Sequence, residues 1–390
     1  MKINYIIVRE LPGILLYIHI QLLSFGDLMD FDSYADNYSK SISKKQCLEL
    51  FEDNENLFNI LNCANKINKK INGNTITYVV NRNINFTNIC VGDCKFCAFK
   101  VDENHNDAYF INPKEIGKKA FEAKKLGCTE VCIQGGLRNN IDVELQSNIL
   151  KEVCSATKPL GGIHIHAFSP MEVKFASENS GLDIKEALMI LKENGLNTMP
   201  GTAAEILDDN IRAELCPSKL STKEWIKIVK TAHKVGIKTT STMMYGHIEE
   251  YKHIVNHLFI LKEIQEETGG ITEFVPLSFM HKMAPIYYEG NARGGSSGIE
   301  DLKVYAISRM LFGDTIKNIQ VSWVKLGIKL AQMGLKCGAN DFGGTLMEEN
   351  ISKSAGASYG TYMGAEEIRN VINAIGGAPR ERDTFYNILE

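Results

Sequence analysis

From residue 74 onward the sequence repeats one pattern: a short β-branched stretch, a loop rich in Gly, Pro or polar residues, and an amphipathic helix. Strands that alternate with helices form parallel sheets, because each helix returns the chain to the same end of the sheet. Eight such strands suffice to close a barrel, so we predict an α/β fold of the (β/α)8 TIM type. The predicted strands are 75–85, 130–133, 162–167, 197–200, 238–244, 272–277, 318–323 and 336–341.

The helices between these strands have clear start and stop signals. Pro113 marks the start of a predicted amphipathic helix over 114–126. Ser221 and Glu224 resemble a capping box before a predicted helix over 225–235. We predict that residues 29–73 are N-terminal helices packed on the barrel. Residues 74–390 would then form the barrel with its C-terminal helices.

Residues 1–28 carry two apolar runs, each shorter than the ~20 residues that a membrane-spanning helix needs. We expect this segment to be an upstream extension or a wrongly assigned start, and no membrane anchor. The net charge of −4 gives no basic excess, so nucleic acid is not an expected partner. The scattered cysteines are typical of a cytoplasmic protein.

Three cysteines, Cys90, Cys94 and Cys97, form a Cys-x3-Cys-x2-Cys triplet in a loop after the first predicted strand. Three thiolates can hold three irons of a 4Fe-4S cluster and leave the fourth iron open to a small molecule. A structural zinc site is an alternative, but it needs a fourth ligand, and His105 is the nearest candidate. An iron-sulfur scaffold or electron-transfer protein is a further, non-catalytic alternative.

Other reactive side chains also fall at or just beyond the ends of predicted strands. In a barrel the carboxyl ends of the strands share one rim, where active sites of this fold lie. The set comprises Gln134, Gly135, Gly136, His166, Ser169, Glu205, Tyr245, His247, Ser278, Trp323, Asn340 and Asp341.

The triplet and four further segments resemble the tyrosine-utilising subunits of FO synthases, which belong to the radical S-adenosylmethionine (SAM) superfamily. The four segments are 81–90, 163–172, 200–207 and 337–350. The resemblance covers about residues 45–390.

The resemblance implies a transferase that binds a 4Fe-4S cluster and SAM. In that family an adenosyl radical takes hydrogen from L-tyrosine, and cleavage of the Cα–Cβ bond releases 2-iminoacetate. The 4-hydroxybenzyl fragment then joins 5-amino-6-(D-ribitylamino)uracil, in the biosynthesis of the deazaflavin of coenzyme F-420. Expected partners are a companion ring-closing FO synthase subunit and a low-potential electron donor.

By this resemblance the three cysteines ligate the cluster, and Gln134, Gly135 and Gly136 grip the methionine amino group of SAM. A glutamine here replaces the usual acid and precedes the glycines. The glycines could instead serve only backbone geometry. Glu205 would contact the adenosyl ribose or the methionine ammonium, or else be an acidic residue near a helix N-terminus.

His166, Tyr245 and His247 are the candidate catalytic residues, because a rim histidine could take a proton from the tyrosine ammonium. Ser169 is a candidate for substrate binding. His164, by strand alternation on the same face as His166, could be a core histidine.

Asn340 and Asp341 close the eighth predicted strand, where they would suit the uracil edge or the ribityl hydroxyls. A structural Asx turn is the competing interpretation.

Two other enzymes share the barrel and the triplet. One is the menaquinone-pathway aminofutalosine synthase-like radical SAM enzyme, and the other is the ring-closing FO synthase subunit. The segment 166–171 favours the tyrosine-utilising family.

Overall fold

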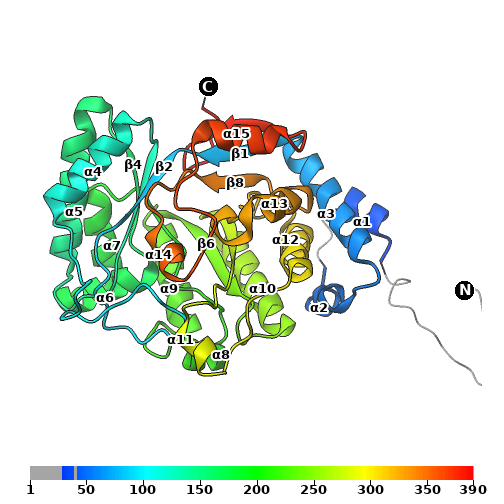
Figure 1. The fold of residues 1–390 in the computed structure, drawn as a ribbon, viewed down its shortest axis with the longest axis horizontal. Helices are drawn as coiled ribbons and strands as arrows, with labels where there is room; N and C mark the ends of the chain where they lie inside the picture. The colour runs from blue at the N-terminus through cyan, green and yellow to red at the C-terminus, as the bar shows by residue number, and fades with distance from the viewer. Residues whose placement is uncertain (1–28, 39–41, 390) are drawn as a thin grey trace, which may run out of the picture.

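A ring of parallel strands surrounded by helices forms the centre of the computed structural model, which describes residues 29–38 and 42–389 (Figure 1). The predicted extension at residues 1–28 lies outside the described residues. The strands are β1 Thr75–Val79, β2 Asn81–Asn85, β3 Glu130–Gln134, β4 His164–Ala167, β5 Thr198–Met199, β6 Lys238–Tyr245, β7 Ile271–Ser278, β8 Asp341–Gly344 and β9 Ala378–Glu381.

Two parallel sheets build the barrel, in the orders β2-β3-β4-β5-β6-β7 and β8-β1-β9. The sheets are joined where β1 runs into β2, and also through single bridges from Phe274 to Ile319 and from Gln320 to Asp341. The predicted barrel class is therefore confirmed, and six of its eight predicted strands are present.

The last two predicted strands are wrong. Residues 318–323 make only the single bridges, and Trp323 begins helix α13, Trp323–Lys336. The stretch 336–341 is the end of that helix and a turn at Gly338, whose φ is 119°, so β8 begins only at Asp341. A short apolar run does not distinguish a buried strand from a buried helix.

Helices cover the outside of the strands (Figure 1). The predicted helices 114–126 and 225–235 are confirmed as α4 and α9. Besides α13 and a 3-10 helix at Lys158–Leu160, the helices are α1 Phe31–Asp36, α2 Lys44–Glu52, α3 Leu57–Asn72, α4 Pro113–Lys125, α5 Val143–Thr157, α6 Pro170–Ser180, α7 Ile184–Glu193, α8 Asp209–Leu215, α9 Thr222–Lys234, α10 Tyr251–Thr268, α11 Pro285–Tyr288, α12 Gly298–Phe312, α14 Asn350–Ser354 and α15 Ala365–Asn373.

The predicted capping box is present at the start of α9. Ser221 Oγ accepts from the Glu224 backbone N–H, and Glu224 accepts from the Ser221 N–H. The N-terminal helices α1 to α3 lie beside α12 (Figure 1). No helix within the described residues is long and apolar enough to span a membrane.

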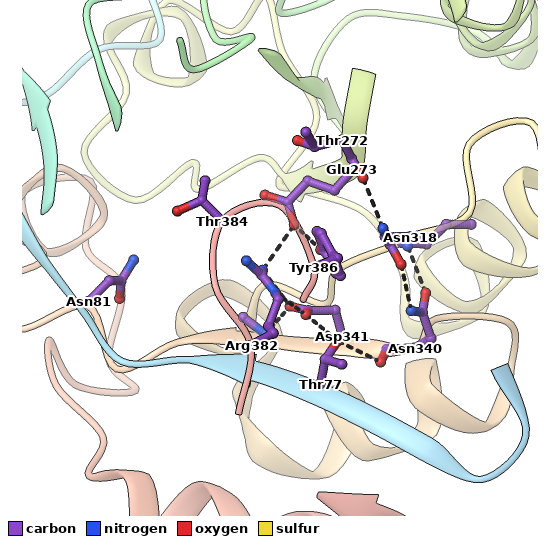
Figure 2. Close-up of polar contacts among 12 residues, drawn as sticks. Thr77, Asn81, Thr272, Glu273, Asn318, Asn340, Asp341, Arg382, Thr384 and Tyr386 are labelled. Carbon is purple, nitrogen blue, oxygen red and sulfur yellow. Dashed lines mark hydrogen bonds and ion pairs between the residues drawn. The ribbon is translucent and has the colours of Figure 1, made fainter. Parts of the chain in front are cut away.

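The segment after β9 closes the amino-terminal end of the barrel. Arg382, which is 2% exposed, donates to Asp341 over 2.7 Å and to Glu273 over 3.2 Å (Figure 2). Thr384 donates to Glu130 over 2.6 Å. The three carboxylates stand near the starts of β8, β7 and β3, so one short segment ties three strands together.

Replacing Arg382 with Met should lower the free energy of unfolding by about 3–5 kcal/mol, because it leaves buried carboxylates without their cation. Denaturant unfolding at neutral pH measures the change. Arg380→Ala is the matched control, since Arg380 is exposed on β9, two residues before Arg382, and its loss should cost less than about 0.5 kcal/mol. Equal losses in the two variants would contradict the assigned role of Arg382.

Candidate functional site

A cavity of about 400 Å³ opens at the carboxyl ends of the strands, and all three cysteines of the triplet line it. Gln134 and Thr202 contribute at the ends of β3 and β5, and Met244 and Leu277 contribute from β6 and β7. The cavity therefore lies on the rim where the fold predicts an active site.

The cysteine loop follows β2 and has no regular secondary structure around Cys90 and Cys94. A Cβ atom built on Gly92 would lie 3.3 Å from Cys90 Sγ and 4.0 Å from Cys94 Sγ, so these two thiols approach one point. Cys97 follows after a turn in which its N–H donates to the Cys94 carbonyl over 3.2 Å. The loop thus presents three soft sulfur donors to one cavity.

This donor set fits an iron-sulfur cluster. Within residues 29–38 and 42–389, no three His, Cys, Asp or Glu side chains converge closely enough to hold one metal ion. His105, the candidate fourth zinc ligand, is exposed, and its Nδ1 accepts from the Asp107 N–H over 3.1 Å. Three thiols that line one cavity are the soft donors that iron-sulfur clusters use.

The glycines after β3 pack tightly against the cysteine loop. A Cβ atom on Gly136 would lie 2.2 Å from the Ile89 carbonyl oxygen and 2.9 Å from Cys90 Cβ. On Gly135 it would lie 2.7 Å from the Phe86 ring. These glycines line the cavity and also permit a close backbone approach, so both interpretations offered by the sequence fit the structure.

Glu205 pairs with a lysine that sequence reasoning missed. Lys219 Nζ lies 2.5 Å from Glu205 Oε1, and the two side chains are 16% and 13% exposed. Burial acts to raise the pKa of Glu205, but the charge and hydrogen bond of Lys219, together with Arg212 and His247, lower the pKa overall. The ammonium of Lys219 also lies 5.1 Å from the centre of the Phe96 ring. A fixed ion pair therefore stands beside the cysteine loop.

Ser169 lines the cavity as the N-cap of α6. Its backbone N–H donates to Glu172 over 2.8 Å, and the Gly135 N–H donates to the same carboxylate over 2.9 Å. Burial raises the pKa of Glu172, although these hydrogen bonds oppose the rise. Sequence reasoning missed Glu172, but its place three residues after Ser169 is the signal of a capping box.

His166 lies inside the barrel, below the rim. It stands on β4, opposite Thr198, and lines a second cavity of about 180 Å³ that shares Gln134 and Thr202 with the first. The Thr198 hydroxyl lies 2.7 Å from His166 Nδ1 and 2.7 Å from His164 Nε2. Burial lowers the pKa of His166 to about 4, so the ring is neutral at pH 7.

Tyr245 and His247 line neither cavity. Met244 faces the rim cavity, so strand alternation turns Tyr245 outward, where its hydroxyl donates to Asp301 over 2.8 Å. His247 is fully buried, with Nε2 3.1 Å from the Met244 carbonyl and Nδ1 3.0 Å from Glu249. These placements speak against the direct catalytic roles predicted for both residues.

Asn340 and Asp341 lie at the amino-terminal end of β8, so their predicted place at the rim is wrong. Asn340 accepts from Arg309 over 2.9 Å, and Asp341 accepts from Arg382 and from the Gly343 N–H over 2.8 Å. The Gly343 contact is an Asx-type bond, which agrees with the competing interpretation.

Two more rim predictions have different outcomes. Trp323 does line the rim cavity, and its indole N–H donates to the Gly344 carbonyl over 3.0 Å. Ser278 lines neither cavity and lies 2.7 Å from the Ser296 hydroxyl.

Solved structures of two enzymes share the fold. Methylornithine synthase (PylB) matches with a TM-score of 0.68 at 18% identity, covering 90% of this chain and 96% of that one. The FeFe-hydrogenase maturase HydG from Carboxydothermus hydrogenoformans matches with a TM-score of 0.71 at 15% identity, covering 91% and 80%.

Sequence comparisons identify the family. Residues 84–261 match the model of the radical SAM superfamily, and residues 268–390 match the CofH/MqnC C-terminal region. A relative from Methanocaldococcus jannaschii is 68% identical over 90% of this chain and 98% of its own length. One from Archaeoglobus fulgidus is 54% identical over 86% and 95%. Both are named 5-amino-6-(D-ribitylamino)uracil–L-tyrosine 4-hydroxyphenyl transferase, and the chain belongs to this family within the radical SAM superfamily.

Proposed function

We propose that this enzyme transfers the 4-hydroxybenzyl group of L-tyrosine to 5-amino-6-(D-ribitylamino)uracil, with release of 2-iminoacetate, in FO biosynthesis. The observation that carries the proposal is the cysteine triplet lining a rim cavity that shares wall residues with a cavity inside the barrel, in a chain 68% identical to a relative named for this transfer. The bound cluster and SAM would supply the radical that starts the cleavage of tyrosine.

The residues around the rim suggest how the cofactors are held. Cys90, Cys94 and Cys97 would ligate the cluster, while Gln134 with its two glycines would contact the methionine end of SAM. Glu205 is already oriented by Lys219, so its carboxylate could accept from a ribose hydroxyl or an ammonium without reorganising. Ser169 faces the same space and is kept as a substrate-binding candidate.

The inner cavity suits a polar acceptor. Its wall includes the hydroxyls of Thr240 and Thr242, the amide of Gln320 and the imidazole of His166. Such groups match the hydroxyls of a ribityl chain and the edge of a uracil. The rim cavity above adds apolar side chains, including Leu277 and Phe279, that suit the phenol ring of tyrosine.

The names of the relatives favour the tyrosine transferase over the menaquinone-pathway alternative. The C-terminal family description covers both CofH and MqnC, whereas the relatives compared above carry the transferase name alone. The companion ring-closing subunit and the low-potential electron donor stay predictions.

The direct test is anaerobic reconstitution followed by incubation with dithionite, SAM, L-tyrosine and the diaminouracil. We expect 5'-deoxyadenosine, 2-iminoacetate and the 4-hydroxybenzyl adduct to form in equal amounts. Deoxyadenosine without loss of tyrosine would refute the substrate assignment. No deoxyadenosine with any substrate would favour the non-catalytic scaffold.

Replacing Cys94 with Ala should abolish the site-differentiated cluster and all cleavage of SAM, because one of three iron ligands is lost. Iron content and deoxyadenosine yield measure the two effects. Cys154→Ala is the control, since Cys154 is exposed and lies outside the cavity, and it should keep both. Full activity in the Cys94 variant would overturn the ligand assignment.

Replacing His166 with Ala should lower adduct formation roughly tenfold, the effect of one lost hydrogen bond of about 1.4 kcal/mol, with SAM cleavage kept. His164→Ala is the matched control, because His164 contacts the same Thr198 hydroxyl but does not line the inner cavity. Quantifying adduct and deoxyadenosine together checks this. If both variants lose adduct equally, the effect belongs to the Thr198 network and not to a substrate contact.

A further inference from the structure

One lysine in the rim cavity has no hydrogen-bond or ion-pair partner among residues 29–38 and 42–389. Lys325, in the first turn of α13, lines the cavity with a partly buried side chain. Within the described part of the chain its ammonium makes no hydrogen bond or ion pair.

The other charged side chains of this cavity all have partners. Lys219 pairs with Glu205, and Lys100 donates to the Gly92 carbonyl over 2.6 Å. Glu172 accepts from Gly135, and Glu349 accepts from the Asn83 amide and from the Ser352 N–H. Lys325 therefore differs in kind from its neighbours.

Enclosure makes an unpaired ammonium unfavourable unless a ligand supplies an acceptor. Burial lowers the pKa of Lys325, while the charges of Glu349 and Glu205 oppose that shift. Neither carboxylate is within ion-pair distance of it. The Lys325 ammonium can therefore pair with an anionic group of a ligand in the cavity.

Two ligands of the proposed reaction carry an α-amino-acid carboxylate: L-tyrosine and the methionine part of SAM. The methionine part would lie at the cluster, on the side of the cavity where the Lys219 ammonium stands 5.1 Å from the ring of Phe96 in the cysteine loop. Lys325 instead follows the stretch at Ile319 and Gln320, which bridges β7 and β8, whereas the cysteine loop follows β2. Trp323, two residues before Lys325, lines the same cavity. Lys325 therefore belongs to the cavity wall that the C-terminal part of the chain contributes.

We propose that Lys325 binds the carboxylate of the L-tyrosine substrate. The inference rests on the proposed function, because it assigns one end of that substrate. Glu349, held by Asn83 and Ser352 on the same wall, is placed to receive the ammonium of the amino acid.

The test compares Lys325→Ala, Lys325→Met and Lys325→Arg in the reconstituted enzyme. We expect the Ala and Met variants to raise the KM for L-tyrosine about 10- to 100-fold, the range for losing a hydrogen bond to a charged group, with the KM for SAM changed less than about twofold. Lys325→Arg should restore most of the affinity. Lys329→Ala, an exposed lysine on the same helix, should leave both values unchanged.

Tyramine, which lacks the carboxylate, provides a readout that a folding defect would not mimic. As a competitive inhibitor it should bind the unmodified enzyme more weakly than L-tyrosine does, and Lys325→Ala should erase that difference. A raised KM for SAM with an unchanged KM for L-tyrosine would instead assign Lys325 to the cofactor carboxylate. Failure of the proposed function would look different, since the unmodified enzyme would then consume no tyrosine.

Discussion

The buried arginine at the floor of the barrel allows the interior to be polar. Arg382 lies between Glu273 and Asp341 at the amino-terminal end (Figure 2). Glu130, which accepts from Thr384, stands at the start of β3 at the same end. Burial raises the pKa of Glu273 to about 7, with Asp341 and Glu130 adding to the rise and Arg382 opposing it. Without that guanidinium the carboxylates would repel one another in a site with little water.

A polar interior sets this barrel apart from the usual packing of the fold, in which layers of branched apolar side chains fill the centre. Here the layer above the floor carries His166, Thr242 and Gln320, and it lines an inner cavity that shares wall residues with the rim cavity. The chemistry then changes with height along the barrel axis. Thiols and ion pairs surround the mouth, while hydroxyls and amides line the depth. A radical cofactor at the mouth and a hydroxylated acceptor below it are compatible with this order.

How far the sequence predicted this arrangement depends on the range of the interactions involved. Local signals succeeded: the cysteine triplet, the capping box at Ser221 and six of the strands are all present. The predicted strand at 336–341 is wrong because α13 ends at Lys336 and a turn at Gly338 follows. Since β8 begins only at Asp341, Asn340 and Asp341 lie at the floor and not at the rim. The structure differs from the prediction for Tyr245 for another reason. Which side chains of a buried strand face the barrel interior is fixed by the neighbouring strands and not by the strand's own sequence.

Lys219 and Lys325 were both invisible to sequence reasoning, because a lysine near a helix ordinarily extends into solvent. Their environments also differ in what a ligand must do to bind. Glu205 and Lys219 already neutralise each other in an ion pair. A ligand that contacts either side chain is therefore oriented by the pair but compensates little additional charge. A carboxylate that reaches Lys325 displaces no partner from the described part of the chain, and it compensates an ammonium that burial disfavours. Selectivity for an amino acid over its decarboxylated amine should therefore depend on Lys325 and not on Lys219.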